Sequence, residues 1–188
     1  GVVGCVISGV ITGAFYGMGA IYAQNLGYSV FDVSLFMGVS VIGGLIMQWP
    51  IGRLSDRFDR RTVMFIMLLA LAIYGDGSFV AVLVLIGLFG GTAATVYPLA
   101  VAHACDYVEP PQMLAASSGL LLSWAIGSAI GPLVASTVMG QFADPALFVM
   151  LAASALLLAG FIRYRMIRRV AKPAEEQTNF VPVSTMML

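Results

Sequence analysis

The chain consists of long apolar runs separated by short polar segments. Six stretches contain no Asp, Glu, Lys or Arg, and they cover residues 1–31, 33–52, 62–75, 77–105, 110–143 and 145–162. A transmembrane helix needs about 20 apolar residues, and five of the stretches reach or approach this length. The runs are continuous and do not alternate with a period of two, which argues against the strands of a membrane barrel. The pattern therefore predicts an all-α membrane protein with six transmembrane helices.

The third stretch, 62–75, is shorter than the others. As a helix it would measure about 21 Å, against a hydrocarbon core of roughly 30 Å. We still expect it to cross the membrane, because without it the two basic clusters of the chain would lie on opposite sides of the bilayer. Three explanations of its length are open: residues missing around 74–79, a local thinning of the membrane, or a natural deletion.

Charge is scarce and clustered. Of 188 residues, nine are Lys or Arg and nine are Asp or Glu, 60% are hydrophobic, and the mean hydropathy is +0.98. A soluble domain carries roughly 25% charged residues, so this composition excludes one. All nine basic residues lie in 53–61 and 163–172, and basic loops stay cytoplasmic. We expect a multi-pass inner-membrane protein that begins on the cytoplasmic side, with a six-span domain over 1–168 and a cytoplasmic tail over 169–188.

Motifs of soluble enzymes are absent. The sequence has no HExxH, P-loop, GxSxG or paired CxxC motif, so we expect no enzyme activity, no cofactor, no metal site and no nucleic-acid partner. No charged residue lies in mid-membrane, where a proton-carrying carboxylate would stand. Cys5 and Cys105 fall near cytoplasmic helix ends, where a disulfide is not expected. The sole histidine, His103, is either an interfacial residue bonded to a neighbouring loop or a protonation switch.

Small residues and prolines mark places where helices approach each other or bend. Two stripes have a spacing of four residues: Gly9, Gly13 and Gly17, and Gly119, Ser123, Gly127 and Gly131. Such stripes indicate close helix packing, or alternatively a sliding surface in a transporter. Pro98 and Pro132 remove backbone donors and should bend their helices, and bent helices often line cavities. Our candidates for a substrate cavity are Tyr16, Tyr97 and Trp124, which lie deep in these spans or on glycine-rich helices.

The polar segment 52–61, GRLSDRFDRR, is the strongest motif. It must reverse a helix within the headgroup layer, where Gly52 permits a tight exit and Asp56 can cap amides and attract arginine. The segment resembles the G-x-L-x-D-R-x-G-R-R loop of the major facilitator superfamily. The matching residues are Gly52, Leu54, Asp56, Arg57, Arg60 and Arg61. Asp59 stands where the pattern has Gly, and Asp tolerates the left-handed backbone better than most residues.

The resemblance covers about residues 1–168 and is greatest to the C-terminal half of the YcaD-type branch. Further matching positions are Gly4-Cys5, Ser8-Gly9, Gln48-Trp49-Pro50, Tyr97-Pro98, 105–109, Gly127-Ser128 and Gly131-Pro132. The resemblance implies one half of a fold of two six-helix bundles around a central cavity, with alternating access. It also implies that Gly52, Asp56, Arg57, Arg60 and Arg61 form a cytoplasmic gating loop.

The resemblance implies the C-terminal half of a secondary transporter for a small molecule, with the N-terminal six-helix half and the lipid bilayer as partners. The absence of buried charge favours a neutral or amphipathic substrate. The chain begins with Gly1 rather than Met, as expected for part of a longer protein. The alternative is a non-transporting six-span membrane subunit that homodimerises or acts as a scaffold.

Overall fold

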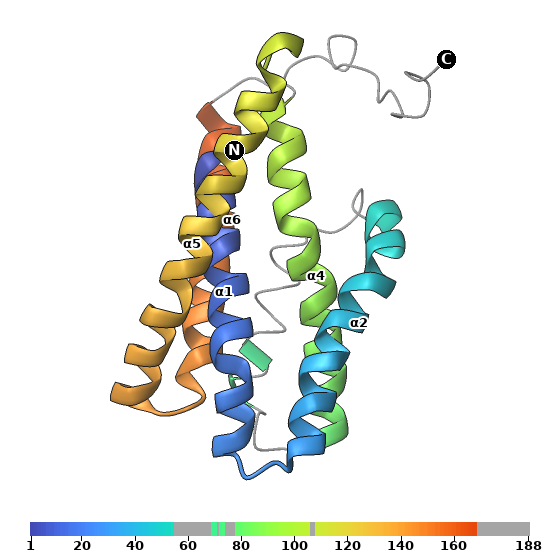
Figure 1. Ribbon diagram of the computed structural model, residues 1–188, viewed down its shortest axis with the longest axis vertical. Coiled ribbons are helices and arrows are strands. Elements are labelled where there is room, and N and C mark those ends of the chain that lie inside the picture. The colour runs from blue at the N-terminus through green and yellow to red at the C-terminus, as the bar shows by residue number, and fades with distance from the viewer. Residues whose placement is uncertain (55–68, 71, 74–77, 106–107, 169–188) are drawn as a thin grey trace.

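The computed structural model describes residues 1–54, 69–70, 72–73, 78–105 and 108–168. Within these residues the chain is helical apart from short connections, which confirms the predicted all-α class. The elements, labelled as in Figure 1, are α1 (Val2–Asn25), α2 (Val30–Leu54), α4 (Phe79–Cys105), the 3-10 helix η1 (Pro110–Gln112), α5 (Met113–Phe142) and α6 (Ala146–Arg168).

Four of these helices are long and apolar enough to cross a membrane. Their apolar segments are Val2–Asn25, Phe79–Val101, Met113–Phe142 and Ala146–Tyr164. In α2 the described side chains give an apolar helix over Val30–Ile46. Most of the expected third span, 62–75, lies outside the described residues. The total of six crossings therefore stays a prediction, while the apolar helices that it requires are confirmed at four positions.

Local sequence signals explain where α1 ends and α2 begins. Gly27 adopts a φ of +81°, a left-handed conformation that glycine tolerates without steric cost. Ser29 Oγ accepts a hydrogen bond from the Asp32 amide at 3.2 Å and donates one to Asp32 Oδ2 at 2.6 Å. This reciprocal arrangement caps the first turn of α2. Two uncharged stretches are longer than the helices they contain. Stretch 1–31 includes the turn after α1 and the start of α2, and stretch 110–143 includes η1.

The helices pack as two close pairs, α1 with α5 and α2 with α4. Figure 1 shows α1 and α4 in the middle, with α5 and α2 at the flanks and α6 behind, where it contacts α1 and α5. Aromatic side chains join the two pairs: the ring of Phe15 lies 4.9 Å from that of Phe89 and 6.0 Å from that of Phe36. Tyr22 continues this core toward α6, 4.8 Å from Phe148.

Glycines bring the backbones of α1 and α5 into direct contact. A Cβ added at Gly131 would lie 2.5 Å from the carbonyl oxygen of Val10, and one at Gly17 would lie 2.7 Å from Pro132. The same backbone contact occurs at Gly9, Gly13 and Gly127. The packing role predicted for the stripes is confirmed at these positions. At Gly119 an added Cβ would meet nothing within 4 Å among the described residues, so the packing role stays a prediction there.

A second glycine interface, which the sequence analysis missed, joins α2 and α4. Gly43 faces the backbone of Gly87, and Gly90 faces the backbone of Ser40. Ser40 is fully buried, and its hydroxyl donates to the Met37 carbonyl at 2.7 Å. Because this bond pairs the hydroxyl within α2, Ser40 can pack against α4 without leaving a buried polar group unpaired. Each helix pair is thus held by close backbone approach.

The helix directions place the arginines of the described helices at one end of the bundle. α1 and α5 begin, and α2, α4 and α6 end, toward the top of Figure 1. Arg53 lies near the end of α2, and Arg163 and Arg168 lie in the last turns of α6. The acidic residues Asp32 and Asp144 belong to the opposite end. The ends of α2 and α6, which the sequence analysis assigned to one side of the membrane, thus lie at the same end of the bundle.

Candidate substrate-facing site

Two of the three cavity candidates are in contact. Tyr97 of α4 and Trp124 of α5 have ring centroids 5.7 Å apart and an interplanar angle of 54°. Both residues are half-buried, so each retains an accessible part. Pro98 follows Tyr97 inside α4 and supplies no backbone N–H to the helix. The backbone that carries Tyr97 is therefore weakened at the position of the aromatic pair.

The third candidate, Tyr16, lies about three helical turns farther along α1 than the level of the Tyr97–Trp124 contact. Cys5 of α1 follows Gly4, where an added Cβ would lie 3.3 Å from the Cβ of Ala100 in α4, three residues after Tyr97. Tyr16 follows Cys5 by eleven residues, which is about three helical turns, so both share one face of α1 at an axial separation of about 16 Å. Tyr16 is 46% exposed, and its ring lies 5.2 Å from that of Phe15. It does not belong to the Tyr97–Trp124 contact.

Hydroxyl groups in the spans bond mainly to their own helices. Thr92 donates to the Phe89 carbonyl at 2.9 Å, and Thr95 donates to the Thr92 carbonyl at 2.8 Å. Ser123, next to Trp124, donates to the Gly119 carbonyl at 2.7 Å. These bonds confirm that such hydroxyls are satisfied about one turn back along their helix. On the face between α1, α4 and α5, the polar groups left for contact with another molecule are then those of the Tyr and Trp rings.

The charged residues that the structure describes stand at helix ends, so the described part of the face between α1, α4 and α5 is uncharged. Within the described residues, no group of three or more His, Cys, Asp and Glu is placed to hold a metal ion. The chemistry of the face is aromatic and apolar. It suits recognition of a neutral or amphipathic molecule by stacking and by occasional hydrogen bonds from Tyr and Trp.

A polar clasp at the opposite end was not predicted. Asn25 Nδ2, in the last turn of α1, donates to Asp144 Oδ1 at 2.6 Å. Asp144 belongs to the connection between α5 and α6, next to Ala143, whose φ is +154°. The bond fixes the end of α1 to that connection. The sequence shows that both residues are polar, but it does not indicate that they pair, because 119 positions separate them.

Most residues of the predicted gating loop fall outside the described part of the chain, namely Asp56, Arg57, Arg60 and Arg61. Gly52 lies within α2, which continues to Leu54. His103 belongs to α4, which ends at Cys105. The roles suggested for the loop and for His103 therefore stay predictions.

The described helices and their apolar composition are those of a multi-pass membrane protein, and the comparison with known families agrees. The family model described as Major Facilitator Superfamily matches residues 1–186. The chain belongs to the Major Facilitator Superfamily. The resemblance stated from the loop motif is thereby confirmed.

Three relatives within the superfamily illustrate the match. An uncharacterized MFS-type transporter of Yersinia enterocolitica is 35% identical over 188 residues, 97% of this chain and 47% of the relative. One of Enterobacter sp. (strain 638) is 38% identical over 162 residues, 84% of this chain and 42% of the relative. The MFS-type transporter YcaD of Shigella flexneri is 38% identical over 157 residues, 81% of this chain and 40% of the relative. The chain thus spans less than half the length of each.

Proposed function

We propose that this chain forms the C-terminal six-helix half of a secondary transporter that moves a small neutral or amphipathic molecule across the inner membrane by alternating access. The observation that carries the proposal is the contact between Tyr97 and Trp124 on an uncharged face. In a chain of a transporter superfamily, such a face suits the wall of a substrate cavity. The other wall belongs to an N-terminal half, consistent with the coverage of the relatives.

The helix directions support the six-span arrangement. α2 ends toward the top of Figure 1, whereas α4 begins at the bottom. The connection between Leu54 and Phe79 must return from one end of the bundle to the other. A return through the membrane gives the even number of crossings that keeps both basic segments, 53–61 and 163–172, on the cytoplasmic side. The tail over 169–188 is then cytoplasmic as well.

The loop after α2 acts in this proposal as a latch. Asp56 pairs with a helix end or an arginine of the N-terminal half and helps to close the cytoplasmic side when the cavity opens outward. Arg57, Arg60 and Arg61 hold the loop in the headgroup layer, where they are attracted to the cytoplasmic surface. Asp59, only three residues from Asp56, has no such partner in the proposal.

The cavity is tested by uptake and efflux in proteoliposomes that contain the full-length protein, with a panel of metabolites and drugs. Trp124→Ala should lower transport of the identified substrate at least tenfold, because the ring supplies much of the contact area. Tyr97→Phe, which keeps the ring, should have the smaller effect. Phe31→Ala is the control, since Phe31 is 74% exposed at the start of α2. Equal transport by Trp124→Ala and wild type would overturn the cavity assignment.

The latch is tested by Asp56→Asn, with Asp59→Asn as the matched control in the same loop. We expect Asp56→Asn to increase the accessibility, from the cytoplasmic side, of a cysteine introduced at a cavity position by Tyr16→Cys, and Asp59→Asn to leave it unchanged. Identical accessibility in both variants would refute the latch. A folded, reconstituted protein that transports nothing in the panel would favour the non-transporting six-span subunit.

A further inference from the structure

Two unusual features meet at the connection between α5 and α6. The first is the polar clasp, in which Asn25 Nδ2 of α1 donates to Asp144 Oδ1 at 2.6 Å. The second is the backbone of Ala143, whose φ of +154° and ψ of 169° lie in a region that is almost reserved for glycine. The strained residue thus stands next to the residue that accepts the bond from α1.

The connection is held in this conformation from two sides. On the α6 side, the Ala143 carbonyl accepts from the Ala146 amide at 3.0 Å, and the Asp144 carbonyl accepts from the Leu147 amide at 3.1 Å. On the α1 side, the clasp holds it. A backbone in this region persists only where its surroundings hold it, so the clasp helps to keep Ala143 strained.

The clasp lies beyond the part of α1 that glycines hold against α5. The last glycine of the α1 stripe is Gly17, and Asn25 lies eight residues, or about 12 Å, farther along the helix. Over this length, α1 is joined to α6 by the ring contact of Tyr22 with Phe148, at 4.8 Å, and to the connection by the clasp. The clasp is therefore the polar fastening of an end that the glycine interface does not hold.

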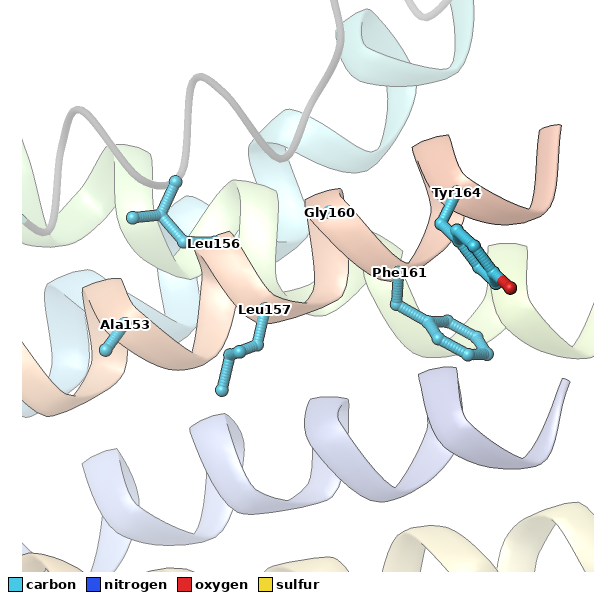
Figure 2. Close-up of a pocket in the computed structure, with 6 residues that line it drawn as sticks. All are labelled: Ala153, Leu156, Leu157, Gly160, Phe161 and Tyr164. Carbon is cyan, nitrogen blue, oxygen red and sulfur yellow. The ribbon is translucent and has the colours of Figure 1, made fainter. Parts of the chain in front are cut away.

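The start of α6 packs into the core, whereas its later turns line a groove. Leu147 and Phe148, in the first turn, are fully buried. Farther along, Leu156, Leu157 and Phe161 line an apolar groove (Figure 2). The clasp thus acts at the buried end of α6, at the edge of a packed contact, and it does not belong to the groove.

We propose that Asn25, Ala143 and Asp144 form a releasable clasp between the end of α1 and the α5–α6 connection. The hydrogen bond to Asp144 stabilises the closed clasp, whereas the strain at Ala143 destabilises it. A hydrogen bond to a charged group and a residue in this backbone region have free energies of similar size and opposite sign. The closed state is therefore favoured by a small margin, and the clasp opens while the buried contact of Tyr22 with Phe148 stays in place.

The clasp gives the proposed transporter a conformational change at the bundle end opposite the arginines. α1 carries Tyr16 of the candidate cavity, and an open clasp lets the end of α1 move relative to the α5–α6 connection. A closed clasp prevents this movement. The role in transport rests on the proposed function, whereas the clasp itself does not.

The clasp is tested by amide hydrogen exchange of the purified full-length protein, followed by mass spectrometry of a peptide that covers residues 146–149, whose amides bond to the connection. Ala143→Gly relieves the strain and should slow this exchange about fivefold. In a connection without strain, the added freedom of glycine would speed it instead. Asn25→Ala should speed exchange about tenfold. Gln24→Ala, at an exposed polar neighbour on α1, is the control and should leave exchange unchanged.

Unchanged or faster exchange in Ala143→Gly would overturn the proposal, and so would equal exchange in Asn25→Ala and Gln24→Ala. Should Asn25→Ala not fold, Asn25→Asp replaces it, because it removes the donor and places two carboxylates together; it should also speed exchange. These readouts need no substrate.

The role in transport is tested in proteoliposomes with Asn25→Cys and Asp144→Cys in one full-length chain, joined by a short thiol cross-linker that a reductant cleaves. Joining should lower transport at least tenfold, and the reductant should restore it. Wild type treated in the same way is the control. Unchanged transport by the joined protein would refute the role in transport. A protein that shows the expected exchange but transports nothing leaves the clasp in place and refutes the proposed function alone.

Discussion

The substitution Gly131→Ala tests how tightly α1 and α5 are packed. The added Cβ would stand 2.5 Å from the Val10 carbonyl oxygen and 2.6 Å from the Ala14 amide nitrogen, whereas ordinary contacts begin near 3.4 Å. Both neighbours are backbone atoms, which cannot move away by a rotamer change. The two helices must therefore separate by up to about 0.9 Å, the difference between 3.4 Å and 2.5 Å. A gap of 0.5–1 Å forfeits roughly a quarter to a half of the dispersion energy across an interface.

The expected magnitude follows from two opposing effects. Overpacking of a close interface costs about 1–3 kcal/mol, and the backbone contacts at Gly9, Gly13 and Gly127 place this case at the upper end. The better helix propensity of alanine returns up to about 1 kcal/mol. We therefore expect Gly131→Ala to lower the free energy of unfolding by about 2 kcal/mol.

The assay is reversible unfolding of the purified protein in mixed micelles with a rising fraction of dodecyl sulfate, followed by circular dichroism. Gly119→Ala is the matched control on the same helix, because its Cβ would meet nothing within 4 Å. It should be neutral or stabilising by up to about 1 kcal/mol, through propensity alone. Equal unfolding curves for Gly131→Ala and Gly119→Ala would refute the reasoning.

Three further contacts are tested by substitution in the same unfolding assay. Phe15→Ala should destabilise the protein by about 3–5 kcal/mol, because it leaves a cavity between the α1–α5 and α2–α4 pairs. Tyr16→Ala should cost much less, because Tyr16 is exposed. Ser29→Ala should cost about 1 kcal/mol through loss of the α2 cap, and Ser29→Asp should recover most of it; an unchanged Ser29→Ala protein would contradict the cap. Asn25→Ala and Asp144→Ala should each cost about 1 kcal/mol, and the double variant no more than either, since a single bond is lost.

The sequence alone determined the all-α class of the protein and the positions of four membrane-crossing helices. Long uncharged runs have one stable form in lipid, because every backbone N–H and C=O must be paired within the segment. The basic residues at 53–61 and 163–172 predicted that α2 and α6 end on one side, and both helices end toward the same end of the bundle. The motif at 52–61 predicted the superfamily, because its loop has a distinctive pattern of Gly, Asp and Arg.

The tertiary structure alone decided which helices pair and which members of a small-residue stripe lie in the contact. Gly119 and Gly131 have the same place in one stripe of the sequence, yet one faces open space and the other touches the backbone of α1. The α2–α4 interface at Gly43 and Gly87 had no distinguishing signal, and neither did the contact of Tyr97 with Trp124. In water, a polar outer face marks the buried one by contrast. In a bilayer both faces of a helix are apolar, so the sequence pattern does not indicate which one packs.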